Sequence, residues 1–362
     1  MSCHRSSRLL SLAGAFALVL TLALAGLAGR SSATPPWAGM PITQPPQPKN
    51  GPGGRAHPYR GFRVTAGGSG NDAWYAFEPT RPRPRKAPLA IVMHGYFEFT
   101  GYEQMYAFIS HTVRRGSVVI YPRWQTGIAD PCPGPFNIEP CITSSVTGIR
   151  GAISYLQSSP KRVQPNLRET SYFGFSFGGI LTADMANRYR SLDLPTPRAI
   201  FLDDPHDGGF GRGDERALDD SLAGIPRSVK FECHSGADGV MSQTPTATGG
   251  GGESCNAVFP KIPQIPNKNK DLVLTHTDSH GEPTLSSAHG VCAGGAPGFG
   301  PANAYDWNFC WKVWDALRSC AYSGTDCRYA LGDTPQHRSL GRWSDGVPVT
   351  PLKIQNAAPI VP

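Results

Sequence analysis

The chain has 362 residues and a formal net charge of +7, enough length for one large or two small folded domains. This charge is mild and excludes a strongly basic nucleic-acid-binding protein. The densest basic run, RPRPRK at 81–86, is short, interrupted by proline and free of aromatic residues. We expect a solvated loop there and no nucleic-acid partner.

The first 33 residues have the pattern of a secretory signal. Arg5 and Arg8 precede an uncharged apolar run from Leu9 to Gly29, and small residues follow at 31–33. We expect cleavage near Ala33 and export to the extracellular space or the periplasm. Cleavage would remove three arginines and lower the net charge to +4. The alternative is an uncleaved membrane anchor, because the run is long enough to span a bilayer; we expect membrane contact only in that case.

The cysteine count supports export. Nine cysteines are present, and eight remain when Cys3 is removed with the signal. An even number in an exported chain indicates disulfides. The sequence contains no C-x-x-C pair, so it gives no support for a structural zinc site. Spacing favours two local pairs, Cys132 with Cys141 and Cys320 with Cys327. Four cysteines are left to pair among themselves in an order that spacing does not determine: Cys233, Cys255, Cys292 and Cys310.

Residues 34–58 are rich in proline and glycine and lack apolar periodicity. We expect a poorly ordered leader there, followed by a single folded domain at 59–362. The domain begins with two apolar runs, Phe62–Thr65 and Trp74–Phe77, joined by a glycine-rich turn. These runs predict a hairpin at the edge of a sheet.

Short apolar runs then alternate with longer helical stretches. Strands are predicted at 89–93, 117–121, 171–173, 198–202, 228–233 and 271–275, and helices at 102–114, 146–156 and 178–189. This alternation is typical of parallel strands joined by right-handed crossovers. We therefore predict an α/β fold with a mostly parallel, doubly wound sheet, helices on both faces and disulfide staples. A tryptophan-rich helix from Ala304 to Tyr322 is expected to cover the last open face.

The stretch YFGFSFGGILTADMANRY contains a candidate nucleophile, Ser176. A nucleophile elbow requires a strand before the serine, a turn with very small neighbours, and a helix after it. Gly174 and Gly178 provide the small neighbours, and Gly179 allows close approach of the helix. The helix directs its first N–H groups toward the serine, which favours developing negative charge.

A serine nucleophile also requires two oxyanion donors. The loop after the first parallel strand is the expected source of one of them. We therefore predict that the N–H of Tyr96 acts together with the N–H of Phe177. In the same loop, His94 is interpreted as a structural residue that hydrogen-bonds the backbone.

The acid and the base are expected at later strand ends, in the order Ser, Asp, His. Asp204 ends one predicted strand, and Asp238 follows the next, so both are candidate acids. For the base we prefer His280 over His289, because His280 follows its strand almost at once and has less freedom to miss the serine. His276 is expected to be structural.

The segment VMHGYFEFTGYEQMYAFISHTVRRGSVVIYP resembles the chlorophyllase pattern. Leu202–Gly208 is similar to the segment that carries the catalytic aspartate of that family, and Gly-x-Ser-Phe-Gly-Gly resembles the elbow of platelet-activating-factor acetylhydrolases. The resemblance spans roughly Pro88 to His280 and implies an α/β-hydrolase fold, a secreted serine esterase, and Asp204 as the acid. Phe175 and Phe177 stand where chlorophyllases have His and Arg, so the resemblance implies ester hydrolysis without implying chlorophyll as the substrate.

These features predict a secreted serine hydrolase that cleaves carboxylic esters through an acyl-enzyme, with the triad Ser176, Asp204 and His280. The substrate is expected to be a small-molecule or polymeric ester, including a lipid ester, and the enzyme is expected to be a monomer without a cofactor. One alternative is a binding protein that kept the hydrolase scaffold. Another is a calcium site formed by four neighbouring residues: Asp203, Asp204, His206 and Asp207.

Overall fold

The computed structural model describes residues 40–96, 101–127, 138–206, 217–239, 254–296 and 298–360. Two compact units are distinguished, Met1–Met40 and Pro41–Pro362, and the architecture below is that of the second unit. The predicted signal at 1–33 lies outside the described residues. Among those residues, no helix is long and apolar enough to cross a bilayer.

The core of the fold is a nine-stranded sheet with the order β1-β2-β4-β3-β5-β6-β7-β8-β9. The six central strands, in the order β4-β3-β5-β6-β7-β8, run parallel to one another. Antiparallel strands lie at both edges, β1 and β2 at one and β9 at the other. The strands are β1 Gly61–Gly67, β2 Trp74–Thr80, β3 Lys86–Met93, β4 Val118–Pro122, β5 Gln164–Phe175, β6 Pro197–Asp203, β7 Lys230–Gly236, β8 Lys270–Thr275 and β9 Lys353–Gln355.

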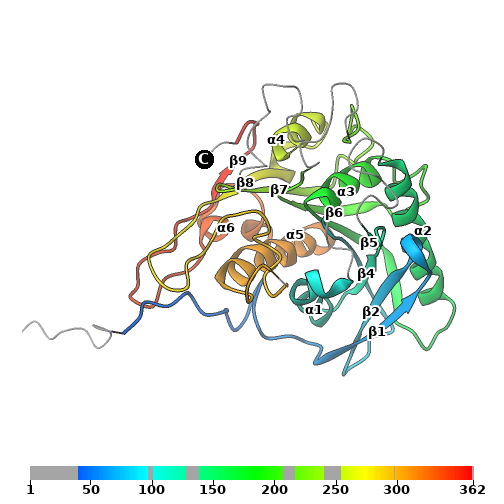
Figure 1. Ribbon diagram of the computed structural model, residues 1–362, viewed down its shortest axis with the longest axis horizontal. Helices are drawn as coiled ribbons and strands as arrows, with labels where there is room; N and C mark the ends of the chain where they lie inside the picture. The colour runs from blue at the N-terminus through cyan, green and yellow to red at the C-terminus, as the bar shows by residue number, and fades with distance from the viewer. Residues whose placement is uncertain are drawn as a thin grey trace, which may run out of the picture. The chain divides into compact units, whose positions relative to one another are not determined.

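Helices cover both faces of the sheet (Figure 1). One face carries α2 (Glu139–Gln157) and α3 (Phe177–Asn187), and the other carries α1 (Tyr106–Arg114) and α5 (Trp311–Ser323). A π-helical turn, η5 (Asp306–Cys310), leads into α5. The short helices are α4 Cys255–Val258, α6 Pro335–Arg338, η1 Gly70–Asp72, η2 Tyr102–Met105, η3 Phe259–Lys261, η4 Asn267–Asn269 and η6 Cys327–Tyr329.

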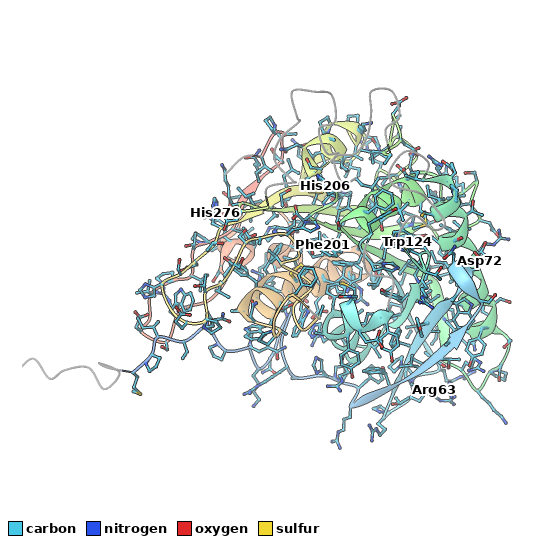
Figure 2. All side chains as sticks on the ribbon, viewed as in Figure 1. Arg63, Asp72, Trp124, Phe201, His206 and His276 are labelled. Carbon is cyan, nitrogen blue, oxygen red and sulfur yellow. A yellow bond between two sulfur atoms is a disulfide. The ribbon has the colours of Figure 1, made fainter. Side chains whose placement is uncertain are left out.

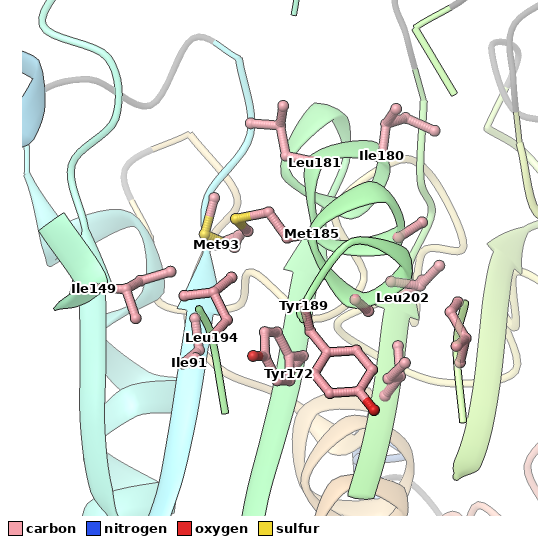
Figure 3. Packing of buried hydrophobic residues seen from close by; sticks show 14 of the residues in the cluster. Ile91, Met93, Ile149, Tyr172, Ile180, Leu181, Met185, Tyr189, Leu194 and Leu202 are labelled. Atoms are coloured by element: carbon pink, nitrogen blue, oxygen red, sulfur yellow. The ribbon is translucent and has the colours of Figure 1, made fainter. Parts of the chain in front are cut away.

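Each face of the sheet has its own hydrophobic core. Strand residues that are buried on both faces explain the near-continuous apolar runs in the sequence. Figure 3 shows the core under α3, where Met185 of the helix and Leu194 after it lie over Ile91, Met93 and Tyr172 of the sheet. The opposite core contains the tryptophans of α5, among them Trp314, which is fully buried. The predicted α/β fold, with a mostly parallel sheet, helices on both faces and disulfide staples, is confirmed.

The segment before β1 differs from the predicted leader. The compact unit begins at Pro41, and hydrogen bonds tie the segment to distant residues. The N–H of Gly53 donates to Asp315 Oδ2 at 3.0 Å, and the indole of Trp307 donates to the carbonyl of Pro45 at 3.1 Å. Prolines fix the backbone of this segment, and the helix side chains supply the hydrogen-bond partners that its own backbone lacks.

Three disulfides lie among the described residues: Cys233–Cys255, Cys292–Cys310 and Cys320–Cys327. The local pair Cys320–Cys327 is confirmed, and the four remaining cysteines pair among themselves as expected. Cys141 is also disulfide-bonded, whereas its predicted partner, Cys132, lies outside the described residues. The bond from Cys292 to Cys310 joins the loop after β8 to the start of the α5 region.

Candidate active site

Ser176 occupies a sharp turn between β5 and α3. Its backbone has φ 54° and ψ −128°, a region that residues with a side chain rarely adopt. Two backbone hydrogen bonds hold this conformation: the Ser176 N–H donates to the Asp203 carbonyl at 3.0 Å, and the His206 N–H donates to the Ser176 carbonyl at 3.1 Å. A strained residue between a strand and a helix, held by the end of the neighbouring strand, is the geometry of a nucleophile elbow.

The glycines around Ser176 are required by close backbone contacts. A Cβ on Gly174 would lie 2.3 Å from Thr182 Oγ1, and one on Gly178 would lie 2.1 Å from the carbonyl oxygen of His94. A Cβ on Gly179 would lie 2.8 Å from the Cβ of Pro205. The elbow is therefore packed against both the loop after β3 and the turn after β6.

The structure brings Ser176, His289 and Asp204 together. His289 Nε2 lies 2.9 Å from Ser176 Oγ, and His289 Nδ1 lies 2.6 Å from Asp204 Oδ2. A carboxylate only accepts hydrogen bonds, so Nδ1 carries the imidazole proton and Nε2 accepts from the serine hydroxyl. Asp204 is fully buried and has φ 45°, so its carboxylate is held in one direction.

The choice of His280 as the partner of Ser176 is corrected by this geometry. His280 Nε2 lies 2.7 Å from Asp345 Oδ2, in the segment after α6. His289, the second choice, occupies the predicted place of the base. Asp238, the alternative acid, accepts a hydrogen bond from the Thr277 hydroxyl, whereas Asp204 has the contact with the histidine.

The path of the chain after β8 explains why the nearer histidine is displaced. Asp278 and Leu285 exchange two backbone hydrogen bonds, both 2.9 Å, so residues 279–284 form a loop that carries His280 away. The chain then returns to the strand end, where Ser287 Oγ donates to the Thr275 carbonyl at 2.7 Å. His289 follows two residues later. The number of residues from the strand end was thus a poor guide to which histidine reaches Ser176. The bridge between Asp278 and Leu285 brings the chain back to the strand end, so His289 lies close to it in space.

His94 and Tyr96 lie in the loop after β3, next to the start of α3. The imidazole of His94 is fully buried and stacked between Trp124 and Tyr121, with ring centroids 4.6 and 5.2 Å away. Its Nδ1 lies 2.8 Å from the Gly95 carbonyl oxygen. Burial lowers the pKa of His94 to about 4, so the ring is neutral at pH 7. These contacts support the structural role predicted for His94.

The two predicted oxyanion donors belong to neighbouring segments. The rings of Tyr96 and Phe177 meet edge to face with centroids 5.3 Å apart. Phe177 is the first residue of α3, and the first N–H groups of a helix have no acceptor within it. The Phe177 N–H therefore belongs to the helix end that adjoins the serine.

Aromatic side chains flank the serine on both sides. Phe175 lies 4.9 Å from the His289 ring and 6.0 Å from Phe299, measured between centroids. Phe175 is buried, whereas 37% of Phe299 is exposed. On the other side, Trp124 lies 5.8 Å from Phe177. Trp124 and His206, which follow the ends of β4 and β6, are labelled in Figure 2. Phe97 and Phe99 lie outside the described residues.

The acidic cluster at the end of β6 does not converge on one point. Asp203 Oδ1 contacts His234 Nδ1 at 2.7 Å, whereas Asp204 Oδ2 contacts His289. Asp207, which the calcium hypothesis includes, lies outside the described residues. Within the described ranges, no group of three or more His, Cys, Asp and Glu residues is arranged to hold a metal ion.

No family model matches the chain, and no curated protein matches it. Solved structures do match in part. One is esterase B from Lactobacillus rhamnosis HN001, with 16% identity and a TM-score of 0.32 over 40% of this chain and 49% of that one. Another is a thermostable esterase from Pseudomonas putida ECU1011, with 17% identity and a TM-score of 0.31 over 40% of this chain and 44% of that one. The chain thus spans less than half the length of each structure.

Proposed function

We propose that this protein is a serine hydrolase that cleaves carboxylic esters, with Ser176 as the nucleophile, His289 as the base and Asp204 as the acid. The observation that carries the proposal is the continuous contact from Ser176 Oγ through His289 to Asp204 Oδ2, at 2.9 and 2.6 Å. A serine hydroxyl becomes a useful nucleophile when an oriented base takes its proton, and the third residue fixes the tautomer of that base.

The proposed reaction has two steps. Ser176 Oγ forms a bond to the ester carbonyl carbon while its proton passes to His289 Nε2. The tetrahedral intermediate collapses, the bond to the alcohol oxygen breaks, and His289 gives its proton to that oxygen. Water then attacks the acyl-enzyme, giving a proton to His289, and the released Ser176 oxygen recovers it. Asp204 stabilises the imidazolium that forms in each step.

The oxyanion of each tetrahedral intermediate requires donors that are already in place. We assign this role to the N–H groups of Tyr96 and Phe177. The proposal is supported by the position of Phe177 at the start of α3 and by the packing of the Tyr96 ring against it. The dipole of α3 adds a favourable field at the same point.

The proposed substrate class rests on the aromatic side chains beside Ser176. Phe299 is 37% exposed beside Phe175, which packs on His289. A small-molecule or polymeric ester with an apolar acyl or aryl group has a suitable contact there.

We also propose that the protein is exported. Disulfides persist in oxidising compartments, and three disulfides join cysteines among the described residues.

The test is covalent trapping of the nucleophile. Incubation with a fluorophosphonate is expected to label wild-type protein at Ser176 and to abolish turnover, as mapped by mass spectrometry of the peptide. Hydrolysis of p-nitrophenyl acetate is expected to begin with a burst of about one p-nitrophenolate per chain, since the acyl-enzyme accumulates. The Ser176→Ala variant is the control. Unlabelled wild-type protein without turnover on any ester would contradict the proposal and favour a binding protein.

A further inference from the structure

A buried chain of polar side chains lies directly behind the candidate triad. Asp203 Oδ1 lies 2.7 Å from His234 Nδ1, and His234 Nε2 lies 2.9 Å from Thr275 Oγ1. Thr275 Oγ1 in turn lies 2.6 Å from Ser287 Oγ. All four residues are fully buried. We call these four residues the support network.

One end of the support network holds the acid and the nucleophile. Asp203 precedes Asp204 in the chain, and its carbonyl accepts the hydrogen bond from the Ser176 N–H. The carbonyl of His234 accepts from the N–H of Asp204 at 2.8 Å, which helps to hold that residue at a positive φ. The side-chain contact between Asp203 and His234 therefore links the backbones on which Ser176 and Asp204 depend.

The other end holds the base. Ser287, two residues before His289, donates to the Thr275 carbonyl at 2.7 Å and accepts from the Ala237 N–H at 2.9 Å. The Ser287 hydroxyl thus fastens the histidine loop to the ends of β7 and β8. Asp238 N–H also donates to the carbonyl of Ser287, at 3.2 Å.

The proton count shows that these contacts depend on one another. When the Ser287 hydroxyl donates to the Thr275 carbonyl, the Thr275 hydroxyl must supply the proton of the Thr275–Ser287 contact. His234 Nε2–H then donates to Thr275 Oγ1, and one further proton lies between His234 Nδ1 and Asp203. Removing one hydroxyl leaves a buried donor or acceptor unpaired, which costs about 1–3 kcal/mol. Apolar side chains at these four positions would avoid this cost. The polar network is therefore better explained by the positions in which it holds the neighbouring backbone than by a gain in stability.

We propose that the support network Asp203–His234–Thr275–Ser287 positions Asp204 and His289 against Ser176. This inference rests on the proposed ester hydrolysis. The four members are positioning residues, since their contacts reach the reacting atoms only through the backbone and through the triad.

The first test compares Thr275→Val with Thr275→Ser. Valine keeps the shape but removes the hydroxyl, and serine keeps the hydroxyl. Because small misplacements of catalytic groups are costly, Thr275→Val is expected to lower kcat for p-nitrophenyl acetate about 10- to 100-fold with KM changed less than about twofold. Thr275→Ser is expected to restore most of kcat. Ser287→Ala is a second variant, with the same expected loss of kcat, for the case in which Thr275→Val does not fold.

The matched control is Thr112→Val in α1. Thr112 is also fully buried, and its hydroxyl donates to the Phe108 carbonyl and accepts from the Trp314 indole. This variant is expected to lower Tm without changing kcat. If the folded Thr275→Val and Ser287→Ala variants keep wild-type kcat, the inference is overturned.

A spectroscopic readout separates this inference from the proposed reaction. The proton between His289 Nδ1 and Asp204 is expected at low field in the ¹H NMR spectrum, assigned by its loss in His289→Ala. It is expected to shift or exchange faster in Thr275→Val but not in Thr112→Val. If the protein hydrolyses no ester but Thr275→Val shifts this signal, the proposed function is wrong and the positioning role of the support network stands. If the signal is unchanged in Thr275→Val, the positioning role is contradicted.

Discussion

His289 Nε2 lies 2.9 Å from Ser176 Oγ, although 113 residues separate the two in the chain. We expect His289→Ala to lower kcat/KM for p-nitrophenyl acetate by about 10⁴-fold or more, because the proposed base and nucleophile would act as a unit. The measurement is the initial rate of p-nitrophenolate release at pH 8.

His280→Ala is the matched control for this prediction. The His280 ring contacts Asp345, in the segment after α6, and not Ser176, so its loss is expected to change kcat/KM less than about threefold. A large loss in His280→Ala together with a mild loss in His289→Ala would require a different arrangement of the loop in solution.

The two candidate acids give the second prediction. Asp204→Asn keeps the shape of the side chain but favours the wrong tautomer of His289, and the expected loss of kcat is about 10⁴-fold. Asp238→Asn removes a carboxylate that contacts Thr277, and kcat is expected to stay within about threefold of wild type. Steady-state kinetics of both variants, each checked for its Tm, distinguishes them. Equal losses in the two variants would contradict the assignment of Asp204.

The third prediction concerns the packing of the elbow. In Gly178→Ala the new Cβ would lie 2.1 Å from the His94 carbonyl oxygen, so the loop that carries Tyr96 must shift. We expect a loss of stability of about 1–3 kcal/mol and a strong loss of kcat, measured by urea unfolding and by ester hydrolysis. Gly127→Ala is the control, since its Cβ meets no atom within 4 Å. Wild-type activity in Gly178→Ala would mean that the loop that carries Tyr96 is not held by this contact.

The sequence predicted the elements whose signals are local. The strands, the edge hairpin and the elbow at Ser176 all depend on short runs of apolar residues and glycines, and the parallel order follows from their alternation. The strand β9 was not predicted, since three residues between prolines and polar side chains carry too little pattern. Residues 34–58 were expected to be poorly ordered, because composition does not reveal side chains such as Asp315, which accepts a hydrogen bond from Gly53 across 262 residues.

The base was the main error within the site. A choice by distance from the strand end favoured His280, but the bridge between Asp278 and Leu285 sends that residue outward. A better signal was present in the sequence. His289 stands three residues before Cys292, and a disulfide near a candidate catalytic residue restricts the loop that carries it. Ser287 gave no recognisable signal, because its contact with Ala237, 50 residues away, depends on how β7 and β8 pair in the sheet.

The disulfide Cys292–Cys310 supplies the fourth prediction. It closes a separation of 18 residues and anchors the loop of His289 to η5. Replacing both cysteines by serine is expected to lower stability by about 3 kcal/mol in the loop-entropy model and also to lower kcat, since the loop gains freedom. The double serine variant of Cys320 and Cys327, a separation of 7 residues, is the control. It is expected to cost about 2 kcal/mol and to keep kcat. Similar kcat values in both variants would show that the first disulfide does not restrain His289.

The last prediction follows from the buried imidazole of His94. Burial lowers its pKa to about 4, whereas the unfolded chain has the ordinary value near 6.5. Between these values the unfolded state binds more protons than the folded state, so the free energy of unfolding rises with pH. The stabilisation is complete above about pH 6.5 and is lost as the pH falls to about 4. At 1.36 kcal/mol per pH unit, the change is on the order of 3 kcal/mol.

Urea unfolding between pH 4 and 7 measures this slope directly. Phenylalanine fits a site between Trp124 and Tyr121 but does not titrate, so His94→Phe is expected to flatten the slope even though the loss of two backbone contacts lowers stability at every pH. Part of the slope is expected to remain, because burial and the neighbouring His111 also lower the pKa of His57, to about 4. An unchanged slope in His94→Phe would show that His94 does not carry this linkage. The slope is the decisive quantity, since lost packing shifts the whole curve and only a lost titration changes its shape.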